Sequence, residues 1–267
     1  MVKPYGLFIV DVTSQNRSFL YGDGFFETMR IENGACSLLT HHLKRAMNTA
    51  TFMEMTWPEH WTHDFFLHEI AAYTNNESYV LRLTFVREAD GLYSPMGSSI
   101  TVHHQYRTFV PSLNAHFFKS HFDEVGFYSI VKKLRPIRVA IYSELLKAIS
   151  PLSNHKLCSA AFYVKAGIFL NKQDEMDDLL LLNTKNRPCE GLSSALLIFL
   201  DGAWVSPPLT EACVKSVYLS FVCEYLEIQF KPITLNDLDG AEHRLLVNAV
   251  QGVRSFTLIR SYIQNPD

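Results

Sequence analysis

The segment "YGDGFFETMRIENGACSLLTHHLKRA", residues 21–46, constrains the fold of this chain more than any other part of the sequence. Two glycines around an aspartate allow a bend, and the aromatic residues that follow predict a strand. Asn33 and Gly34 form a strong signal for a two-residue turn between the arms of a hairpin. Helical spacing of apolar residues follows, with Thr40 as the predicted N-cap. A mononucleotide loop is excluded, because no lysine and hydroxyl residue follow the second glycine.

The rest of the N-terminal part is typical of an α+β unit. Residues 6–12 are short, apolar and rich in β-branched side chains, as expected for a strand. Residues 57–74 predict a second helix, and residues 78–90 and 98–110 alternate as half-buried strands do. A proline-containing break follows at residues 109–114. We therefore predict a small α+β domain over 1–110 and a larger α/β domain over 111–267.

The C-terminal part predicts strands, hairpins and helices in alternation. Residues 137–145 predict a strand, and residues 241–259 lead into the last one. Two hairpins and two helices are expected between them. The hairpins are predicted over 177–191 and 193–209, and the helices over 154–173 and 209–226.

Composition limits the functional classes. The formal net charge of −3 gives no basic surface for nucleic acid, and charged residues interrupt every apolar run before it reaches membrane-spanning length. The N-terminal residues lack the apolar core of a signal peptide. The five cysteines are scattered and form no Cys-x-x-Cys pair, which indicates reduced thiols rather than a disulfide framework or a zinc site. We therefore expect a soluble cytoplasmic protein with neither a nucleic-acid nor a membrane partner.

Segment 21–46 resembles the N-terminal signature of the class IV aminotransferase family, the pyridoxal-phosphate enzymes of fold type IV. The shared features are Tyr-Gly-Asp-Gly, an aromatic residue, Glu-Thr, an arginine, an Asn-Gly turn and the His-Leu-x-Arg start of a helix. Residues 189–217 and 241–259 resemble two later segments of the family. The resemblance implies an α/β (α+β), two-domain fold like that of D-amino-acid aminotransferase, with pyridoxal 5'-phosphate between the domains and a homodimer as the usual assembly.

The resemblance also implies roles for individual residues. Lys156 is the expected Schiff-base lysine and general base, with Lys165 as the alternative, and Glu190 is the expected partner of the cofactor's ring nitrogen. Arg45 is expected to bind the cofactor phosphate. The remaining phosphate-binding positions are Ser216, Val217, Asn248 and Ala249, and the expected substrate-side residues are Glu27, Thr28 and Arg30.

Several positions depart from the family pattern. Ser216 and Leu219 replace the glycine and the arginine at the start of the helix that binds phosphate, and Ala195 replaces an asparagine. Ala160 and Ala161 lie where branched-chain enzymes have a tyrosine. Backbone N–H groups survive such substitutions, so Ser216 and Val217 remain candidate phosphate ligands.

Other patterns carry less information. Arg82 alternates with apolar neighbours and could face either the cleft or solvent. His60, His63 and His68 are interpreted as surface residues rather than metal ligands, because the glutamate of a zinc-protease motif is missing. No metal site is predicted, and no histidine–cysteine pair supports a thiol nucleophile.

Among the activities of the family, we expect 4-amino-4-deoxychorismate lyase, which releases pyruvate and 4-aminobenzoate for folate synthesis. The short chain, the missing N-terminal extension and the missing tyrosine all argue against a branched-chain aminotransferase. A branched-chain or D-amino-acid aminotransferase is the alternative. A non-catalytic paralogue that keeps only the fold is a further one, because of the altered phosphate-binding residues.

Overall fold

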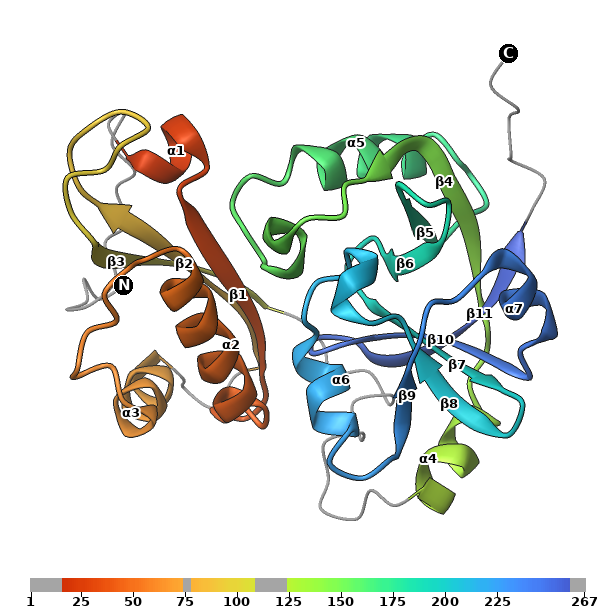
Figure 1. Ribbon diagram of the computed structural model, residues 1–267. Coiled ribbons are helices and arrows are strands. Elements are labelled where there is room, and N and C mark those ends of the chain that lie inside the picture. Colours follow the sequence, from red (N-terminus) through yellow and green to blue (C-terminus); the bar gives the residue numbers. More distant parts are fainter. Residues whose placement is uncertain (1–15, 74–77, 109–123, 260–267) are drawn as a thin grey trace. The chain divides into compact units, whose positions relative to one another are not determined.

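The computed structural model describes residues 16–73, 78–108 and 124–259 (Figure 1). The chain divides into two compact units, Met1–Ser112 with His155–Ser159, and Leu113–Asn154 with Ala160–Asp267. The strand predicted over 6–12 and the domain boundary predicted at 110 lie outside the described residues, so both stay predictions.

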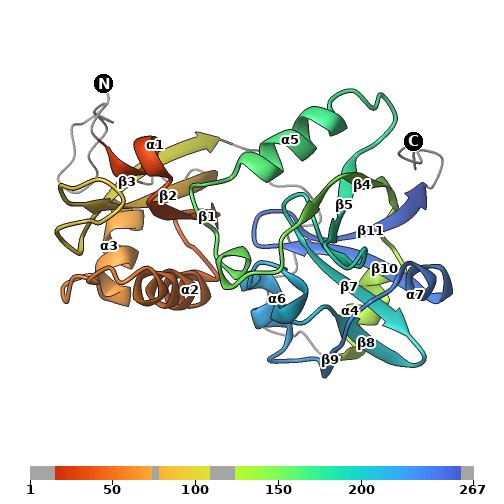
Figure 2. The ribbon, with the colours of Figure 1, turned by 45° about the horizontal axis from the view of Figure 1, so that its top comes forward.

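A three-stranded antiparallel sheet with β2 in the centre forms the first unit. Its strands alternate between buried and more exposed side chains, because one face packs on helices and the other does not. The view in Figure 2 shows two helices, α2 and α3, along the same face of this sheet. The elements are α1 (Arg17–Tyr21), β1 (Gly24–Ile31), α2 (Leu39–Phe52), α3 (His63–Tyr73), β2 (Tyr79–Glu88) and β3 (Ser99–Thr108).

The Asn-Gly turn is confirmed, but the hairpin around it is not. Asn33 and Gly34 both have positive φ, 49° and 80°, as a tight turn of this kind requires. Only one bridge, between Glu32 and Ala35, follows before the chain enters α2. The predicted N-cap was also wrong, because α2 begins at Leu39 and no side chain caps it.

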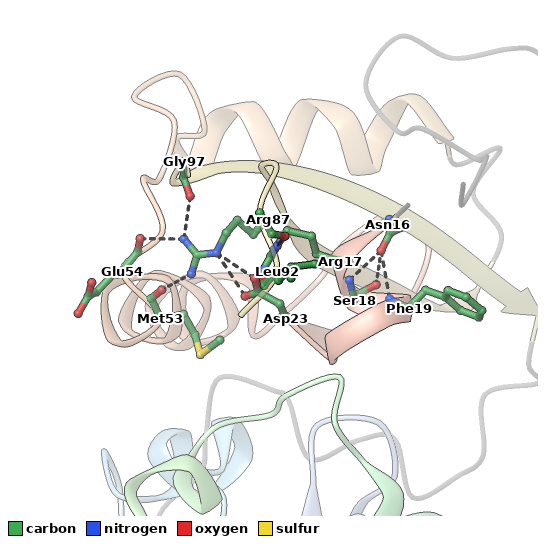
Figure 3. A network of polar contacts seen from close by, with 11 residues as sticks. Asn16, Arg17, Ser18, Phe19, Asp23, Met53, Glu54, Arg87, Leu92 and Gly97 are labelled. Carbon is green, nitrogen blue, oxygen red and sulfur yellow. Dashed lines mark hydrogen bonds and ion pairs between the residues drawn. The ribbon is translucent and has the colours of Figure 1, made fainter. Parts of the chain in front are cut away.

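Asp23 of the Gly-Asp-Gly segment anchors the first unit through two arginines (Figure 3). Arg17 donates from Nε to Asp23 Oδ2 at 2.7 Å, and Arg87 donates from Nε to the same oxygen at 3.0 Å. The Arg87 guanidinium also donates to the carbonyl oxygens of Met53, Glu54 and Gly97. Both arginines are buried, at 5% and 7% exposure, so this network ties α1, β2 and the end of α2 together.

A short segment far along the sequence, His155–Ser159, belongs to the first unit. Phe26 N donates to Lys156 O at 2.9 Å, and Cys158 N donates to Gly24 O at 2.9 Å. The segment therefore pairs with β1 as a short antiparallel bridge. This pairing corrects the helix predicted over 154–173, which begins only at Ala161, because residues 155–159 are extended alongside β1.

The second unit is an eight-stranded mixed sheet in the order β10-β11-β4-β5-β6-β7-β8-β9. Because β10 pairs with both β11 and β7, six of these strands close on themselves, and β8 and β9 extend from β7. Both predicted hairpins, β5–β6 and β7–β8, are confirmed. The strands are β4 (Ile137–Lys147), β5 (Asp178–Asn183), β6 (Pro188–Gly191), β7 (Ala195–Leu200), β8 (Ala203–Ser206), β9 (Ile228–Phe230), β10 (His243–Asn248) and β11 (Gly252–Ile259).

Four helices of the described residues accompany this sheet. They are α4 (Glu124–Val131), α5 (Ala161–Leu170), α6 (Val217–Val222) and α7 (Leu235–Gly240). Aromatic residues of α5 pack on a buried cluster formed by β4, β5 and β6. The helix predicted over 209–226 was too long. A 3₁₀ turn at Leu209–Glu211 ends at Ala212, whose positive φ of 68° interrupts the helix, and α6 starts afresh at its N-cap Ser216. No helix of the described residues is long and apolar enough to span a membrane.

Candidate functional site

A buried carboxylate with two basic partners lies under the first unit's sheet. Arg45, on α2, donates from Nε to Glu27 Oε1 at 2.7 Å and from Nη2 to Oε2 at 2.6 Å. His42 Nδ1 lies 2.6 Å from Glu27 Oε2. Burial alone raises the pKa of Glu27, but the charge of Arg45 and the hydrogen bonds from His42 and Arg45 outweigh burial and lower it to about 2. Glu27 is therefore ionised at neutral pH.

His42 is the neutral member of this cluster. Burial lowers its pKa, and the charge of Arg45 opposes a second cation, although Glu27 acts in the other direction. The neutral ring donates from Nδ1 to Glu27, which leaves Nε2 as an acceptor. Nε2 is buried and has no hydrogen-bond partner among the described residues.

The opposite face of β1 carries a second group of cations. Thr28 and Arg30 lie on this face, whereas Glu27 lies on the helix-covered one, so the three predicted substrate-side residues do not form one surface. Arg30 donates from Nε to Glu32 Oε1 at 2.5 Å. Arg82, whose orientation the sequence left open, is partly buried with its guanidinium carbon 3.6 Å from the ring centroid of Phe26.

Lys156, the predicted Schiff-base lysine, lies against the same aromatic ring. Its Nζ is 4.6 Å from the ring centroid of Phe26, and its side chain is half-buried. The backbone of Lys156 is fixed by the hydrogen bond from Phe26 N. Lys165, the alternative, is exposed on α5. Of the two lysines, Lys156 is therefore the one held in place beside other cations and an aromatic face.

Glu190, the predicted partner of the ring nitrogen, is buried in the second unit and accepts three hydrogen bonds. Lys147 Nζ, from the end of β4, forms a buried ion pair with Glu190 Oε1. Tyr163 OH, from α5, donates to the same oxygen at 2.7 Å. Val214 N donates to Oε2 at 2.8 Å. Lys147 and Glu190 are only 5% and 4% exposed, so this carboxylate already has a counter-ion within the chain.

The other titratable groups around Glu190 are neutral. Burial and the charge of Glu190 raise the pKa of Tyr163, so its phenol keeps its proton. Burial is also the largest cause that raises the pKa of the Cys189 and Cys213 thiols, for Cys213 to about 12. The charge beside Glu190 therefore comes from Lys147.

The predicted phosphate-binding residues of the second unit lie at a helix start and a strand end. The Ser216 hydroxyl caps α6 by accepting from Leu219 N at 3.2 Å, and Val217 is the first helical residue. Asn248 ends β10, and its Oδ1 accepts from Val250 N and Gln251 N at the turn that follows.

Ala249 lies in the turn between β10 and β11. A cavity of about 290 Å³ lies beside α6, and its lining includes Leu219 of that helix, the Pro207–Leu209 turn and Ser216. Of these positions, Ser216 and Val217 lie at a helix start, where backbone N–H groups suit an anion, whereas Asn248 and Ala249 lie at the end of β10 and in the turn after it.

Histidine clusters do not form a metal site in the described part of the chain. His60, His63 and His68 are all exposed. No group of three histidine, cysteine, aspartate or glutamate residues is arranged to hold a metal ion among the described residues. All five cysteines are free.

Sequence reasoning missed three residues that shape these clusters: His42, Lys147 and Tyr163. A signal for His42 was present, because it lies three residues before Arg45 on the same helix face. Tyr163 lies two residues beyond Ala161, so it falls outside the positions at which the family's tyrosine is expected. Lys147 gave no local signal, because it ends a strand whose prediction stopped at residue 145.

A family model described as amino-transferase class IV matches residues 24–259. The aminodeoxychorismate lyase of Vibrio harveyi is 24% identical over 249 residues, which cover 89% of this chain and 83% of the relative.

Two solved structures show the same fold. The 4-amino-4-deoxychorismate lyase from Pseudomonas aeruginosa superposes with a TM-score of 0.73 at 20% identity, covering 94% of this chain and 88% of the other. The branched-chain aminotransferase from Thermoproteus uzoniensis superposes with a TM-score of 0.75 at 16% identity, covering 96% and 85%. At this identity the structures establish the fold alone, and they confirm the predicted mixed α/β class.

Proposed function

Because this chain belongs to the class IV aminotransferase family, it is a pyridoxal-phosphate-dependent lyase or aminotransferase, and we propose that it is a 4-amino-4-deoxychorismate lyase. The family match over residues 24–259 confirms the resemblance seen in the sequence, together with the enzyme class and the cofactor. The lyase reaction releases pyruvate and 4-aminobenzoate from aminodeoxychorismate.

The similarity along 89% of the chain to the Vibrio harveyi lyase supports the lyase. A putative branched-chain aminotransferase of Methanocaldococcus jannaschii is also 24% identical, along 85% of the chain, so an aminotransferase remains the alternative. Local chemistry supports the lyase. Ala160 and Ala161 replace the tyrosine expected of branched-chain enzymes, and the nearby Tyr163 is engaged with Glu190 instead. An aminotransferase must also accommodate a second oxoacid substrate in alternation, whereas a lyase needs one substrate.

The residues present fit pyridoxal phosphate. The group requires an amine, an acid for its ring nitrogen and donors for its phosphate. Lys156 offers a half-buried amine, and Glu190 offers a buried carboxylate. The start of α6 offers N–H groups. When bound, the cofactor would supply an aldehyde for the amine and an aromatic ring that accepts electrons from the substrate.

The proposal assigns the proton transfers to Lys156. Lys156 Nζ takes the proton from the substrate's α-carbon and returns a proton after the bond to the pyruvyl group breaks. The guanidinium of Arg82 lies against the same Phe26 ring as this amine.

The resemblance assigns phosphate binding to several residues of the chain. Arg45 supplies the guanidinium, and Glu27 fixes the orientation of that guanidinium through two hydrogen bonds. Neutral donors come from two places. Ser216 and Val217 supply them at the start of α6, and Asn248 and Ala249 supply them at the end of β10 and in the turn after it. The substrate side is left to Thr28 and Arg30 of β1.

We propose a homodimer in a reducing cytoplasm as the working form. The five free cysteines support the compartment, because four of them are at least partly buried and unpaired by disulfides. The family resemblance supports the dimer.

A coupled assay for pyruvate tests the proposed reaction. Purified protein with pyridoxal phosphate and aminodeoxychorismate should release pyruvate without any added oxoacid. Lys156→Ala should abolish the release, whereas Lys165→Ala should retain it, because Lys165 is exposed. Turnover that requires 2-oxoglutarate would indicate an aminotransferase instead. A protein that gains no visible absorbance band with pyridoxal phosphate would indicate a non-catalytic paralogue.

A further inference from the structure

The cavity beside α6 has apolar side chains both on its buried inner wall and at its mouth. Ala195 and Leu196 of β7 form part of the inner wall and are 8% and 0% exposed. Leu209 and Phe230 also line the cavity, with 43% and 54% of their surfaces exposed. The cavity therefore reaches the sheet of the second unit at one end and exposed residues at the other.

One side of α6 forms a wall of this cavity. Ser216, Leu219, Ser220 and Cys223 line it, and their spacing of three and four residues places them on the same side of a helix. Among the described residues predicted to bind the cofactor in the second unit, Ser216 is the one in the lining, which does not include Glu190. The cavity therefore has little in common with the positions predicted for the cofactor.

The hydroxyl and thiol hydrogens in the lining already have acceptors within the chain. Ser206 Oγ donates to Leu196 O at 2.8 Å, and Ser220 Oγ donates at 2.8 Å to the carbonyl oxygen four residues before it. The thiol of Cys213 donates to the carbonyl oxygen of a proline at 3.3 Å. Because a hydroxyl or a thiol has one hydrogen, these groups have none left for a ligand.

Two positions at which this chain departs from the family pattern lie in the lining. Ala195 stands in place of an asparagine, and Leu219 stands in place of an arginine. Both replacements remove polar groups, and both side chains are shorter than those they replace. The departures from the pattern therefore make this cavity larger and more apolar.

We propose that this cavity binds a small uncharged molecule of the size of one or two aromatic rings. Its volume is about 290 Å³. An apolar cavity of about 150 Å³ holds benzene, and pockets for larger ligands begin at about 300 Å³. The inference goes beyond the proposed function and does not depend on it.

The distribution of charge in the lining favours an uncharged ligand. Lys215 is the charged residue that lines the cavity, and it is exposed. No charged residue contributes to the buried part of the lining, which includes Leu196 and Ser206. A ligand charge buried there would lose its hydration without gaining a counter-ion, and this costs more free energy than the apolar contacts return.

Titration of the full-length protein with 5-fluoroindole, followed by ¹⁹F NMR, tests the proposal. We expect wild type to bind it with a dissociation constant of about 1 mM or below, a range typical of a ligand with so few non-hydrogen atoms. Saturating pyridoxal phosphate should leave this constant unchanged. 5-Fluoroindole-2-carboxylate has the same rings and one negative charge, and it should bind about tenfold more weakly or worse.

Substitutions in the lining test where the compound binds. Leu219→Arg restores the residue type of the family pattern and should raise the dissociation constant by about tenfold or more, because a longer, charged side chain enters the cavity. Leu219→Met conserves the volume and should stay within about twofold of wild type. Leu145→Arg makes the matched substitution at a leucine that is 43% exposed and outside the lining, and it should bind as wild type does.

Ala195→Asn fills the cavity from β7 and provides the same test if Leu219→Arg fails to fold. Wild type that does not bind 5-fluoroindole overturns the inference whatever the variants do. Unchanged binding in Leu219→Arg or, in its place, in Ala195→Asn also overturns it, because the compound then binds elsewhere. Equal or tighter binding of the carboxylate would refute the uncharged class of ligand, and competition by pyridoxal phosphate would make the cavity part of the cofactor site.

Discussion

Replacing Glu27 by glutamine tests whether the buried cluster of the first unit is held by charge. Glu27 is 1% exposed and is bound by Arg45 and His42. Its pKa falls from the ordinary 4.5 to about 2 in the folded chain. At about 1.4 kcal/mol per pKa unit, this difference corresponds to about 3 kcal/mol of folding free energy. Removing one partner of a buried pair costs a similar amount, about 3–5 kcal/mol.

The sign of the pH dependence follows from the lowered pKa. A carboxyl group whose folded pKa lies below its unfolded value stabilises the fold above pH 4.5. This contribution is lost as the pH falls from 4.5 towards 2. The free energy of unfolding should therefore differ by about 3 kcal/mol between wild type and Glu27→Gln at neutral pH, and the two should converge in acid.

Urea unfolding followed by tryptophan fluorescence measures this difference. Trp57 and Trp61 lie in or against the core of the first unit, so a Trp204→Phe background limits the signal to that unit. Glu32→Gln is the matched control. Glu32 also pairs with an arginine, but its side chain is 32% exposed, so the expected change is within about 1 kcal/mol. A difference below about 1 kcal/mol for Glu27→Gln, or one that does not change with pH, would refute the reasoning.

Three further predictions concern stability and reactivity. Asp23→Asn removes the charge that pairs with Arg17 and Arg87, so urea unfolding should show a loss of about 3 kcal/mol; a loss below about 1 kcal/mol would contradict the network. Gly22→Ala should lower the melting temperature, because φ is 68° and the new Cβ would lie 2.9 Å from another Cβ; an unchanged melting temperature would contradict it. Cys223 is the exposed cysteine, so Ellman's reagent should modify it first in native protein. Equal rates of modification for all five thiols would contradict this prediction.

Local signals predicted most of the strands and the Asn-Gly turn. Alternation predicted β2 and β3, and the residue types at Asn33 and Gly34 predicted the turn, because both depend on neighbours along the chain. The helix predictions were wrong where contacts with distant parts of the chain determine the local structure. Residues 155–159 have helical character in sequence, but they pair with β1, more than a hundred residues earlier. Ala212 ends the helical pattern of 209–226 through a positive φ that alanine rarely adopts.

The same distinction between local signals and distant contacts applies to the candidate site. Lys156, Glu190 and Arg45 could be proposed as site residues because their spacing follows a family pattern. Their partners could not, because Lys147 and Tyr163 precede Glu190 by 43 and 27 residues and meet it only after β4, α5 and β6 have folded. The pairing of Arg45 with Glu27 likewise depends on a helix packing under a strand, which no sequence spacing specifies.

The central claim is that the amine of Lys156 takes the cofactor, and a borohydride experiment tests it most directly. Protein loaded with pyridoxal phosphate is reduced with borohydride and digested, and the modified peptide is identified by mass spectrometry. The account predicts that the phosphopyridoxyl group is attached to Lys156. Attachment to Lys147 or Lys165, or the absence of any attached group, would contradict it.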